Sequence, residues 1–250
     1  MDITTIVKNK TDMHSHLLYG IDDGSKTIDQ SIEIAKNLKE MGFSSVVLTP
    51  HYIDKSNFCA NNSKKEEIFK KLKQELKNNN IDLNLYLGNE IYINSNIKDL
   101  IDKGQIYPIN NAKYLLIEFP LYSEINDVLD ILYNLKYEGY KLIIAHPERY
   151  KYFQKDYKKV NDLYKSGVLF QCNYGSIINQ YGKSAKKLFK YLLKQDMVDF
   201  LGTDIHKDNS SLYKKFDKCL KKIEKLIGKD KFKLLTEINP LKVINDEEIE

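Results

Sequence analysis

The feature that most constrains the fold is a repeated alternation of short apolar runs with stretches of helical spacing. Each apolar run is followed by a polar turn, and the pattern recurs about seven times along the chain. Strict alternation with short connections is typical of parallel strands joined by right-handed crossovers. The sequence therefore predicts an α/β fold, and seven such units can close into a barrel.

The boundaries of the expected elements follow from the apolar runs and from turn residues. Two helix starts are well marked, because Thr27 precedes one helix and Ser63 with Glu66 forms a capping box at the next. The expected strands are 11–16, 45–49, 83–87, 114–117, 141–145, 168–172 and 198–202. The expected helices are 28–41, 64–77, 97–103, 124–138, 157–166, 184–195, 211–227 and 232–237, the last ending before Pro240.

Length and hydropathy limit the class of protein. A chain of 250 residues without a linker rich in Pro, Gly or Ser suits one domain over residues 1–250. The mean hydropathy is −0.49, no apolar run approaches the ~18 residues of a membrane span, and residues 1–10 lack the apolar stretch of a signal peptide. Three widely spaced cysteines indicate free thiols. We expect a cytoplasmic protein without membrane insertion.

The charge distribution does not favour nucleic acid as a partner. The net charge is only +4, and Arg149 is the only arginine among 39 basic residues. An alternative is a binding module in which a lysine stripe of the 211–227 helix contacts nucleic acid or anionic lipid. The stripe consists of Lys214, Lys218, Lys222 and Lys225 and lies opposite an apolar set. A solvated outer face of a barrel helix explains that pattern better.

Histidines and acids gather at the ends of the expected strands. All five histidines, and three carboxylates that end apolar runs, lie at or just beyond the carboxyl end of a strand. In a barrel of parallel strands, that rim is where an active site assembles. These residues are His14, His16, His51, Glu90, Glu118, His146, Asp204 and His206.

The spacing and chemistry of this set favour a metal site. In His14-Ser-His16 and Asp204-Ile-His206, alternate residues face the same side of a strand. Imidazole and carboxylate without thiolate suit Zn²⁺, Mn²⁺ or Fe²⁺, and the number of ligands suits two or three ions. Such a cationic cavity would attract a phosphate dianion. The alternative is that each residue is structural, such as a hydrogen-bonded histidine at His51 or a strand end at Glu118.

Several motifs resemble those of the PHP (polymerase and histidinol phosphatase) superfamily. Within it, the sequence most resembles the bacterial manganese-dependent protein tyrosine phosphatases of capsule and exopolysaccharide synthesis. The motifs occur in family order across about 190 residues. They are Asp12-Met-His-Ser-His16, Gly20-Ile-Asp-Asp-Gly-Ser-Lys-Thr27, Leu48-Thr-Pro-His51, Gly88-Asn-Glu90, Leu116-Ile-Glu-Phe119, Ala145-His-Pro-Glu-Arg-Tyr150, Gln171-Cys-Asn173 and Thr203-Asp-Ile-His206.

The resemblance implies a distorted (β/α)7 barrel with a trinuclear metal centre at its rim. It implies Mn²⁺, with Fe²⁺ or Zn²⁺ as alternatives. One implied site consists of His14, His16, Glu90 and Asp204, a second of Glu90, Glu118 and His146, and a third of His51, His206 and Asp23. Asp23 rests on the resemblance alone, because the residues by themselves indicate a turn ahead of Thr27.

Arg149 matches the arginine of the family motif His-Pro-Glu-Arg. The resemblance implies that its guanidinium binds two oxygens of a phosphoryl group, whereas the alternative is a structural salt bridge. Related phosphatases tend to carry a second arginine shortly after the Asp-x-His motif, but residues 207–215 contain none. Lys207, Lys214 or Lys215 are the candidates to supply charge there.

The expected activity is metal-assisted hydrolysis of a phosphomonoester without a covalent enzyme intermediate. The resemblance implies phosphotyrosine as substrate, on a tyrosine-phosphorylated autokinase of polysaccharide export. A cysteine-based mechanism is excluded because Ile143 stands six residues before Arg149, where that mechanism needs its nucleophile. The main alternative is another PHP phosphoesterase, such as a histidinol-phosphate phosphatase.

Overall fold

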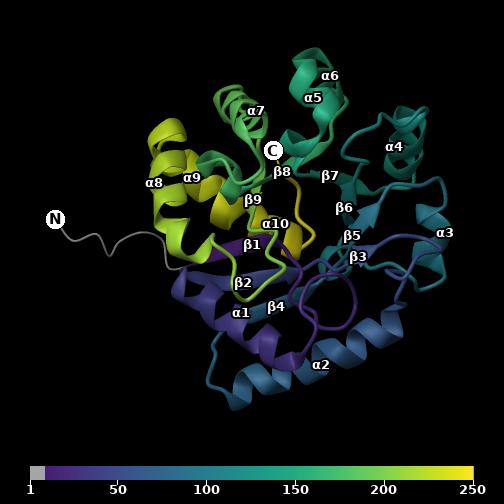
Figure 1. Ribbon diagram of the computed structural model, residues 1–250. Helices are drawn as coiled ribbons and strands as arrows, with labels where there is room; N and C mark the ends of the chain where they lie inside the picture. The colour runs from purple at the N-terminus through teal and green to yellow at the C-terminus, as the bar shows by residue number, and fades with distance from the viewer. Residues whose placement is uncertain (1–8, 250) are drawn as a thin grey trace.

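The computed structural model describes residues 9–249 (Figure 1). Most of the segment that we considered for a signal peptide therefore lies outside the described residues. Parallel strands form two hydrogen-bonded sheets. One contains β1 (Lys10–Ser15), β2 (Phe43–Leu48) and β4 (Asn84–Leu87); the other contains β3 (His51–Tyr52), β5 (Glu90–Tyr92), β6 (Tyr114–Glu118), β7 (Lys141–Ala145), β8 (Leu169–Asn173) and β9 (Phe200–Gly202).

The two sheets are parts of one curled parallel sheet. After a break at Thr49 and Pro50, β2 continues into β3, and β4 likewise continues into β5. The amide of Gly88 donates to the Leu48 carbonyl at 2.9 Å across the first break. At the other edge, the amide of His16 donates to the Ile205 carbonyl at 2.9 Å, which joins the end of β1 to the segment after β9. The predicted α/β fold with a distorted barrel of parallel strands is confirmed.

Helices cover the outside of this curled sheet (Figure 1). On α8, Phe216, Leu220 and Ile223 are buried, whereas Lys218 and Lys222 are exposed, as expected for an outer barrel helix. None of the helices in residues 9–249 has the length and apolar character that a bilayer span requires. The helices are α1 (Ile28–Glu40), α2 (Asn62–Asn78), α3 (Ile97–Asp102), α4 (Val128–Tyr137), α5 (Lys151–Lys155), α6 (Tyr157–Lys165), α7 (Lys183–Lys194), α8 (Phe216–Ile227), α9 (Lys229–Lys233) and α10 (Asn239–Ile244).

Alternate strand residues supply two separate apolar cores. Val46 and Leu115 pack outward with the helices, whereas their neighbours Val47 and Leu116 pack inside the curl. The inner core also contains Val243 of α10. In Figure 1, α10 lies near the centre of the ring of strands. Hydrogen bonds from Asn110 Nδ2 to the Ile244 carbonyl and from the Tyr114 hydroxyl to the Glu247 carbonyl hold this C-terminal segment at the amino-terminal end of β6. The opposite end of the inner core is left for the functional side chains.

Several of the expected helix starts are wrong. Helix α8 begins at Phe216 rather than at residue 211, because a 3₁₀ helix, η5 (Tyr213–Lys215), precedes it. The N-cap of α2 is Asn61, whose side chain accepts from the Lys64 amide at 3.0 Å, so Ser63 lies inside the helix and the predicted capping box does not form. Glu66 instead accepts a hydrogen bond from the Tyr107 hydroxyl. Helix α4 begins at Val128 rather than at residue 124, because Asp127 adopts a left-handed conformation with φ of 61°.

The expected helix end before Pro240 is also wrong. A five-residue π-helix, η6 (Leu234–Ile238), follows α9 and leads directly into α10. Pro240 lies in the first turn of α10, where no amide is needed for an intrahelical hydrogen bond. The chain therefore stays helical to Ile244.

Candidate metal centre

All of the predicted metal ligands meet at the carboxyl-terminal rim of the curled sheet. They form four groups, within each of which one ligand atom per residue lies within 4.8 Å of the others. The groups are His16, Asp23, His51 and His206; His14, Glu90 and His146; His14, His16 and Asp204; and His51, Glu90 and Glu118. The groups overlap only in part with the three implied sites, since His16 also joins the Asp23 group. The division of ligands among ions therefore stays a prediction.

Glu90 lies at the middle of the centre and is fully buried at the start of β5. Its Oε2 atom is 3.1 Å from His14 Nε2 and 3.0 Å from His51 Nδ1. Its Oε1 atom is 2.8 Å from Nε2 of His146, which follows β7. One carboxylate thus contacts imidazoles from three different strand ends. This is the geometry of a bridging ligand.

Asp204 presents its two carboxylate oxygens to different partners. Oδ1 lies 3.6 Å from His14 Nε2 and 3.5 Å from His16 Nε2. Oδ2 accepts from Arg149 Nη1 at 2.6 Å and from Asn173 Nδ2 at 2.8 Å. Arg149 thus forms a salt bridge, the alternative that we considered, while its side chain remains 22% exposed. The carboxylate of Asp204 connects the histidine pair to the arginine.

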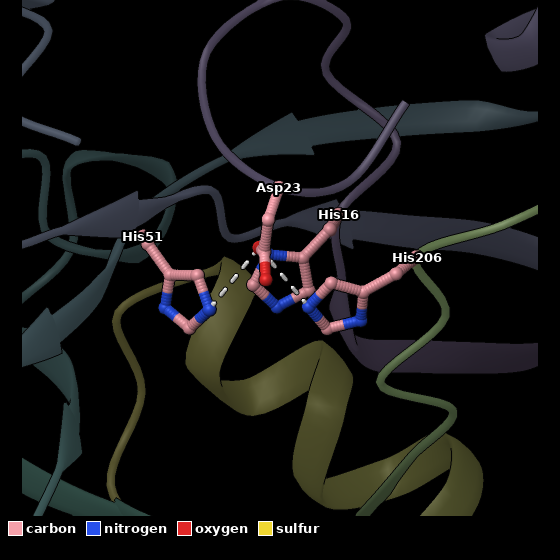
Figure 2. A group of neighbouring side chains, drawn as sticks. All are labelled: His16, Asp23, His51 and His206. Carbon is pink, nitrogen blue, oxygen red and sulfur yellow. Dashed lines mark ion pairs between the residues drawn. The ribbon is translucent and has the colours of Figure 1, made fainter. Parts of the chain in front are cut away.

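Asp23 lies between His51 and His206 (Figure 2) and marks the exposed mouth of the centre. Its Oδ1 atom is 3.5 Å from Nε2 of His51 and 3.5 Å from Nε2 of His206, and its side chain is 54% exposed. The hydrogen bond from His206 lowers the pKa of the Asp23 carboxyl. The rings of His16 and His206 stack with their centres 3.8 Å apart. Asp23, which only the family resemblance identified as a ligand, therefore lies with three histidines.

Two ligand positions have unusual backbone conformations. His146 has φ of 33° and Asp204 has φ of 53°, both in the left-handed region that non-glycine residues rarely adopt. His146 directly follows the end of β7, and Asp204 lies two residues beyond the end of β9, where the chain turns away from the sheet. Such conformations cost about 1 to 3 kcal/mol and concentrate at functional sites. At the rim, they turn each side chain toward the centre.

A second layer of polar residues, which were not among the predicted ligands, orients the histidines. Asp22 Oδ2 contacts His16 Nδ1 at 2.6 Å and accepts from the His51 amide at 2.9 Å. Gln171 Oε1 contacts His14 Nδ1 at 2.8 Å. Such contacts fix the tautomer and orientation of metal-binding imidazoles. A signal was present for both, since Asp22 adjoins Asp23 and Gln171-Cys-Asn173 repeats the alternate spacing of the histidine pair.

The electrostatics of the centre fit divalent cations. Among residues 9–249, the buried His146 Nδ1 has no hydrogen-bond partner, and the buried His51 Nδ1 and Glu90 Oε2, although 3.0 Å apart, make no well-aligned hydrogen bond. Burial and the nearby Glu90 carboxylate raise the pKa of Glu118 to about 8, and burial and the charge of Arg149 lower the pKa of His146 to about 4. Crowded carboxylates and a neutral imidazole are what a cation binds. The nitrogen and oxygen donors suit Mn²⁺, Fe²⁺ or Zn²⁺.

A cavity of about 230 Å³ adjoins the centre. Arg149 lies in its wall together with Lys207, the first of the lysines that we considered as a substitute for a second arginine. Its lining consists of Arg149, Gln180, Tyr181, Asp204, His206, Lys207, Asn209 and Ser210. A larger cavity of about 310 Å³ lies between α4 and α6 on the outer side of the sheet and contains none of the predicted ligands. Of these two cavities, only the smaller one is lined by predicted ligands, Asp204 and His206.

Comparison with known proteins links this geometry to a family. Residues 10–245 match the family model described as capsular polysaccharide synthesis, CpsB/CapC. CapC of Staphylococcus aureus is 35% identical over 199 residues, which cover 78% of this chain and 76% of that protein. The tyrosine-protein phosphatase CpsB of Streptococcus pneumoniae is 29% identical over 242 residues, covering 94% of this chain and 98% of that protein.

Solved structures show the same relationship. One from work on YwqE of Bacillus subtilis and CpsB of Streptococcus pneumoniae, described as unique metal-dependent tyrosine phosphatases, has a TM-score of 0.87, 26% identity and 96% coverage of both chains. Histidinol phosphate phosphatase of Lactococcus lactis, complexed with zinc, L-histidinol and phosphate, has a TM-score of 0.55 and 16% identity, covering 86% of this chain and 94% of that one. The second similarity shows a shared fold alone.

Proposed function

We propose that this chain, which belongs to the CpsB/CapC family of capsular polysaccharide synthesis, holds two or three divalent ions at its rim, most suitably Mn²⁺. The chain is a metal-dependent tyrosine-protein phosphatase. The proposed ligands are His14, His16, Asp23, His51, Glu90, Glu118, His146, Asp204 and His206. The observation that supports this assignment most strongly is Glu90, whose two oxygens contact three imidazoles from different strand ends.

The ions, when bound, supply Lewis-acid activation of water and neutralise charge on the phosphoryl group. The chain's own residues position the substrate. Arg149 offers parallel N–H donors to two phosphoryl oxygens, and Lys207 adds a positive charge in the same cavity. Asp204 holds Arg149 through Oδ2. A phenolate leaves readily, because its pKa of about 10 means that it needs little protonation.

The substrate is proposed to be a tyrosine-phosphorylated autokinase of polysaccharide export. The family's place in capsular polysaccharide synthesis supports this choice. We further propose that residues 1–250 act as one phosphoesterase domain in the cytoplasm. In this setting, the exposed mouth at Asp23 and the cavity beside Arg149 give a phosphotyrosine on a partner protein access to the centre.

The proposal is tested by metal analysis together with metal removal. Purified protein should contain two or three divalent ions per chain, lose turnover of a phosphotyrosine peptide after chelation, and recover it best with Mn²⁺. Parallel assays with histidinol phosphate distinguish the two phosphatase classes. Full activity after exhaustive chelation would contradict the metal mechanism, and faster turnover of histidinol phosphate would assign the chain to the alternative class.

A further inference from the structure

The loop after η4 (Tyr174–Ile178) places an aromatic ring against the guanidinium of Arg149. The Cζ atom of Arg149 lies 4.7 Å from the centre of the Tyr181 ring. We propose that Tyr181 is a positioning residue, which fixes the plane of the Arg149 guanidinium for phosphoryl binding. This inference rests on the proposed function, because it assumes that Arg149 binds the phosphoryl group.

Arg149 needs a second contact if its planar fork is to be oriented. The hydrogen bond from Nη1 to Asp204 Oδ2, at 2.6 Å, fixes one atom of the guanidinium but leaves rotation about that contact. A ring stacked on the face of a guanidinium removes that freedom, and it adds cation–π attraction. Tyr181 therefore controls the orientation of the guanidinium, while Asp204 controls its position.

The Tyr181 ring is itself anchored at its hydroxyl end. Its hydroxyl accepts from Asn173 Nδ2 at 3.2 Å and donates to Asp204 Oδ2 at 3.4 Å. The same Asn173 amide also donates to Asp204 Oδ2 at 2.8 Å. Arginine, ring and amide thus converge on one carboxylate oxygen. A residue placed only to fill the cavity wall would not need this network.

The loop that carries Tyr181 has a specific backbone shape. Gly182 has φ of 94°, which favours glycine directly after the tyrosine. The amide of Gln180 donates to the Gly175 carbonyl at 3.1 Å. This hydrogen bond and the conformation of Gly182 fold the loop back on η4 and bring the ring to the arginine.

Tyr181 and Arg149 line the same 230 Å³ cavity, so the Tyr181 ring can also contact a bound substrate directly. The test must distinguish this role from the positioning of Arg149. The ring could instead stack on the phenyl group of the substrate. Stacking on substrate would change KM for an aromatic ester and leave the binding of inorganic phosphate unaffected. Positioning of Arg149 would change kcat and also weaken inhibition by inorganic phosphate, which has no ring.

The experiment uses two substitutions at one position in the metal-loaded protein. Tyr181→Leu removes the ring and should lower kcat on a phosphotyrosine peptide about 3- to 30-fold, with weaker inhibition by phosphate and unchanged metal content. Tyr181→Phe keeps the ring but removes its hydroxyl anchor, so its kcat should lie between those of wild type and Tyr181→Leu. Tyr137→Leu, at an 81% exposed tyrosine on α4, is the matched control and should leave kcat unchanged.

A double-mutant cycle with Arg149→Lys completes the test. In the Arg149→Lys background, Tyr181→Leu should change kcat less than about twofold, because the planar fork that it orients is absent. An equal loss in both backgrounds, a rise in KM alone, or loss of metal in Tyr181→Leu would overturn the inference. If Arg149→Lys itself has the wild-type kcat, the proposed role of Arg149 fails; if it is impaired while Tyr181→Leu is normal, only the inference about Tyr181 fails.

Discussion

At the scale of single residues, Arg149 is the only group in the chain able to offer a planar pair of donors to a phosphoryl group. Arg149→Lys keeps the charge and loses the fork. We expect kcat to fall about 30- to 1,000-fold, from the ~2 to 4 kcal/mol typical of one transition-state donor. Bound metal should stay unchanged, because Arg149 contacts a proposed ligand without being one.

This prediction is checked by measuring kcat, metal content and melting temperature on one preparation. A purely structural salt bridge to Asp204 predicts the opposite pattern, in which melting temperature falls and turnover does not. Near wild-type turnover would mean that Lys207 and the ions suffice for phosphoryl binding.

The residues of the metal centre could be predicted to different extents. His14 and Glu90 were predictable because strand ends are where parallel sheets gather functional groups. Asp23 needed the family resemblance, since its position in a turn carries no signal of its own. The roles of Asp22 and Gln171 depend on which ring nitrogen each one contacts, and that geometry is set by packing far along the chain.

At the scale of elements, the start of α2 distinguishes two candidate caps. Asn61→Ala should destabilise the protein by about 1 kcal/mol, because it removes the acceptor of the Lys64 amide. Ser63→Ala should change the free energy of unfolding by less than about 0.5 kcal/mol, since Ser63 is an exposed residue inside the helix. Urea unfolding of both variants measures the difference. A larger loss of unfolding free energy in Ser63→Ala than in Asn61→Ala would support the capping box that the sequence predicted.

A buried lysine ties the same helix to the rim. Nζ of Lys65 donates to Asn89 Oδ1 at 2.6 Å and to the Gln105 carbonyl at 2.8 Å. Asn89 in turn donates to the Pro50 carbonyl at 2.8 Å, so the contact links α2 to both strand breaks that precede His51 and Glu90. Burial lowers the pKa of Lys65 to about 7.

Stability should therefore depend on pH through Lys65. The folded state releases this proton near pH 7, whereas the unfolded state keeps it to its ordinary pKa of 10.5, so the contribution to stability grows as pH rises between these values. Unfolding free energies at pH 7 and pH 9 should show a wild-type advantage over Lys65→Met that is larger at pH 9. With Lys73→Met, an exposed position on α2, the difference should stay constant. A Lys65→Met difference that shrinks at pH 9 would contradict the argument.

The limits of element prediction have local causes. Within residues 9–249, periodicity located seven of the nine strands and most of the helices, whereas β3, β5, α5 and α10 lie outside the expected ranges. The early start expected for α4 missed a left-handed Asp127. Proline was interpreted as a helix end at Pro240, whereas a π-helix before it lets the ring occupy a first turn. Both errors concern conformations at a single residue that tertiary packing selects.

At the scale of the whole molecule, stability and chemistry lie at opposite ends of the sheet. Val243 of α10 is fully buried in the inner core, far along the barrel from the rim. Val243→Ala should destabilise the protein by about 2 kcal/mol and leave kcat of the folded protein unchanged. Leu241→Ala, at a 46% exposed neighbour, is the control. Unfolding in urea and steady-state kinetics on the same samples would detect a coupled loss, which would contradict this separation.

The overall architecture was the most predictable level, because alternating elements leave few topologies open. The sequence did not reveal that β2 and β4 continue, after short breaks, as β3 and β5. At these breaks, the side-chain amide of Asn89 donates a hydrogen bond to the Pro50 carbonyl, in place of the backbone hydrogen bonds of a regular sheet. Hydrophobic periodicity is insensitive to a gap of one or two residues.

The wide spread of the rim ligands along the chain has a consequence for biogenesis. The proposed ligands run from His14 to His206, and α10 closes the inner core only after Asn239. A ribosome makes the chain from its amino terminus, so an emerging polypeptide exposes isolated histidines long before it can surround an ion. In zinc fingers, by contrast, neighbouring ligands let the ion drive folding. A centre built from these proposed ligands can be completed only after His206 has been synthesised and the barrel has formed.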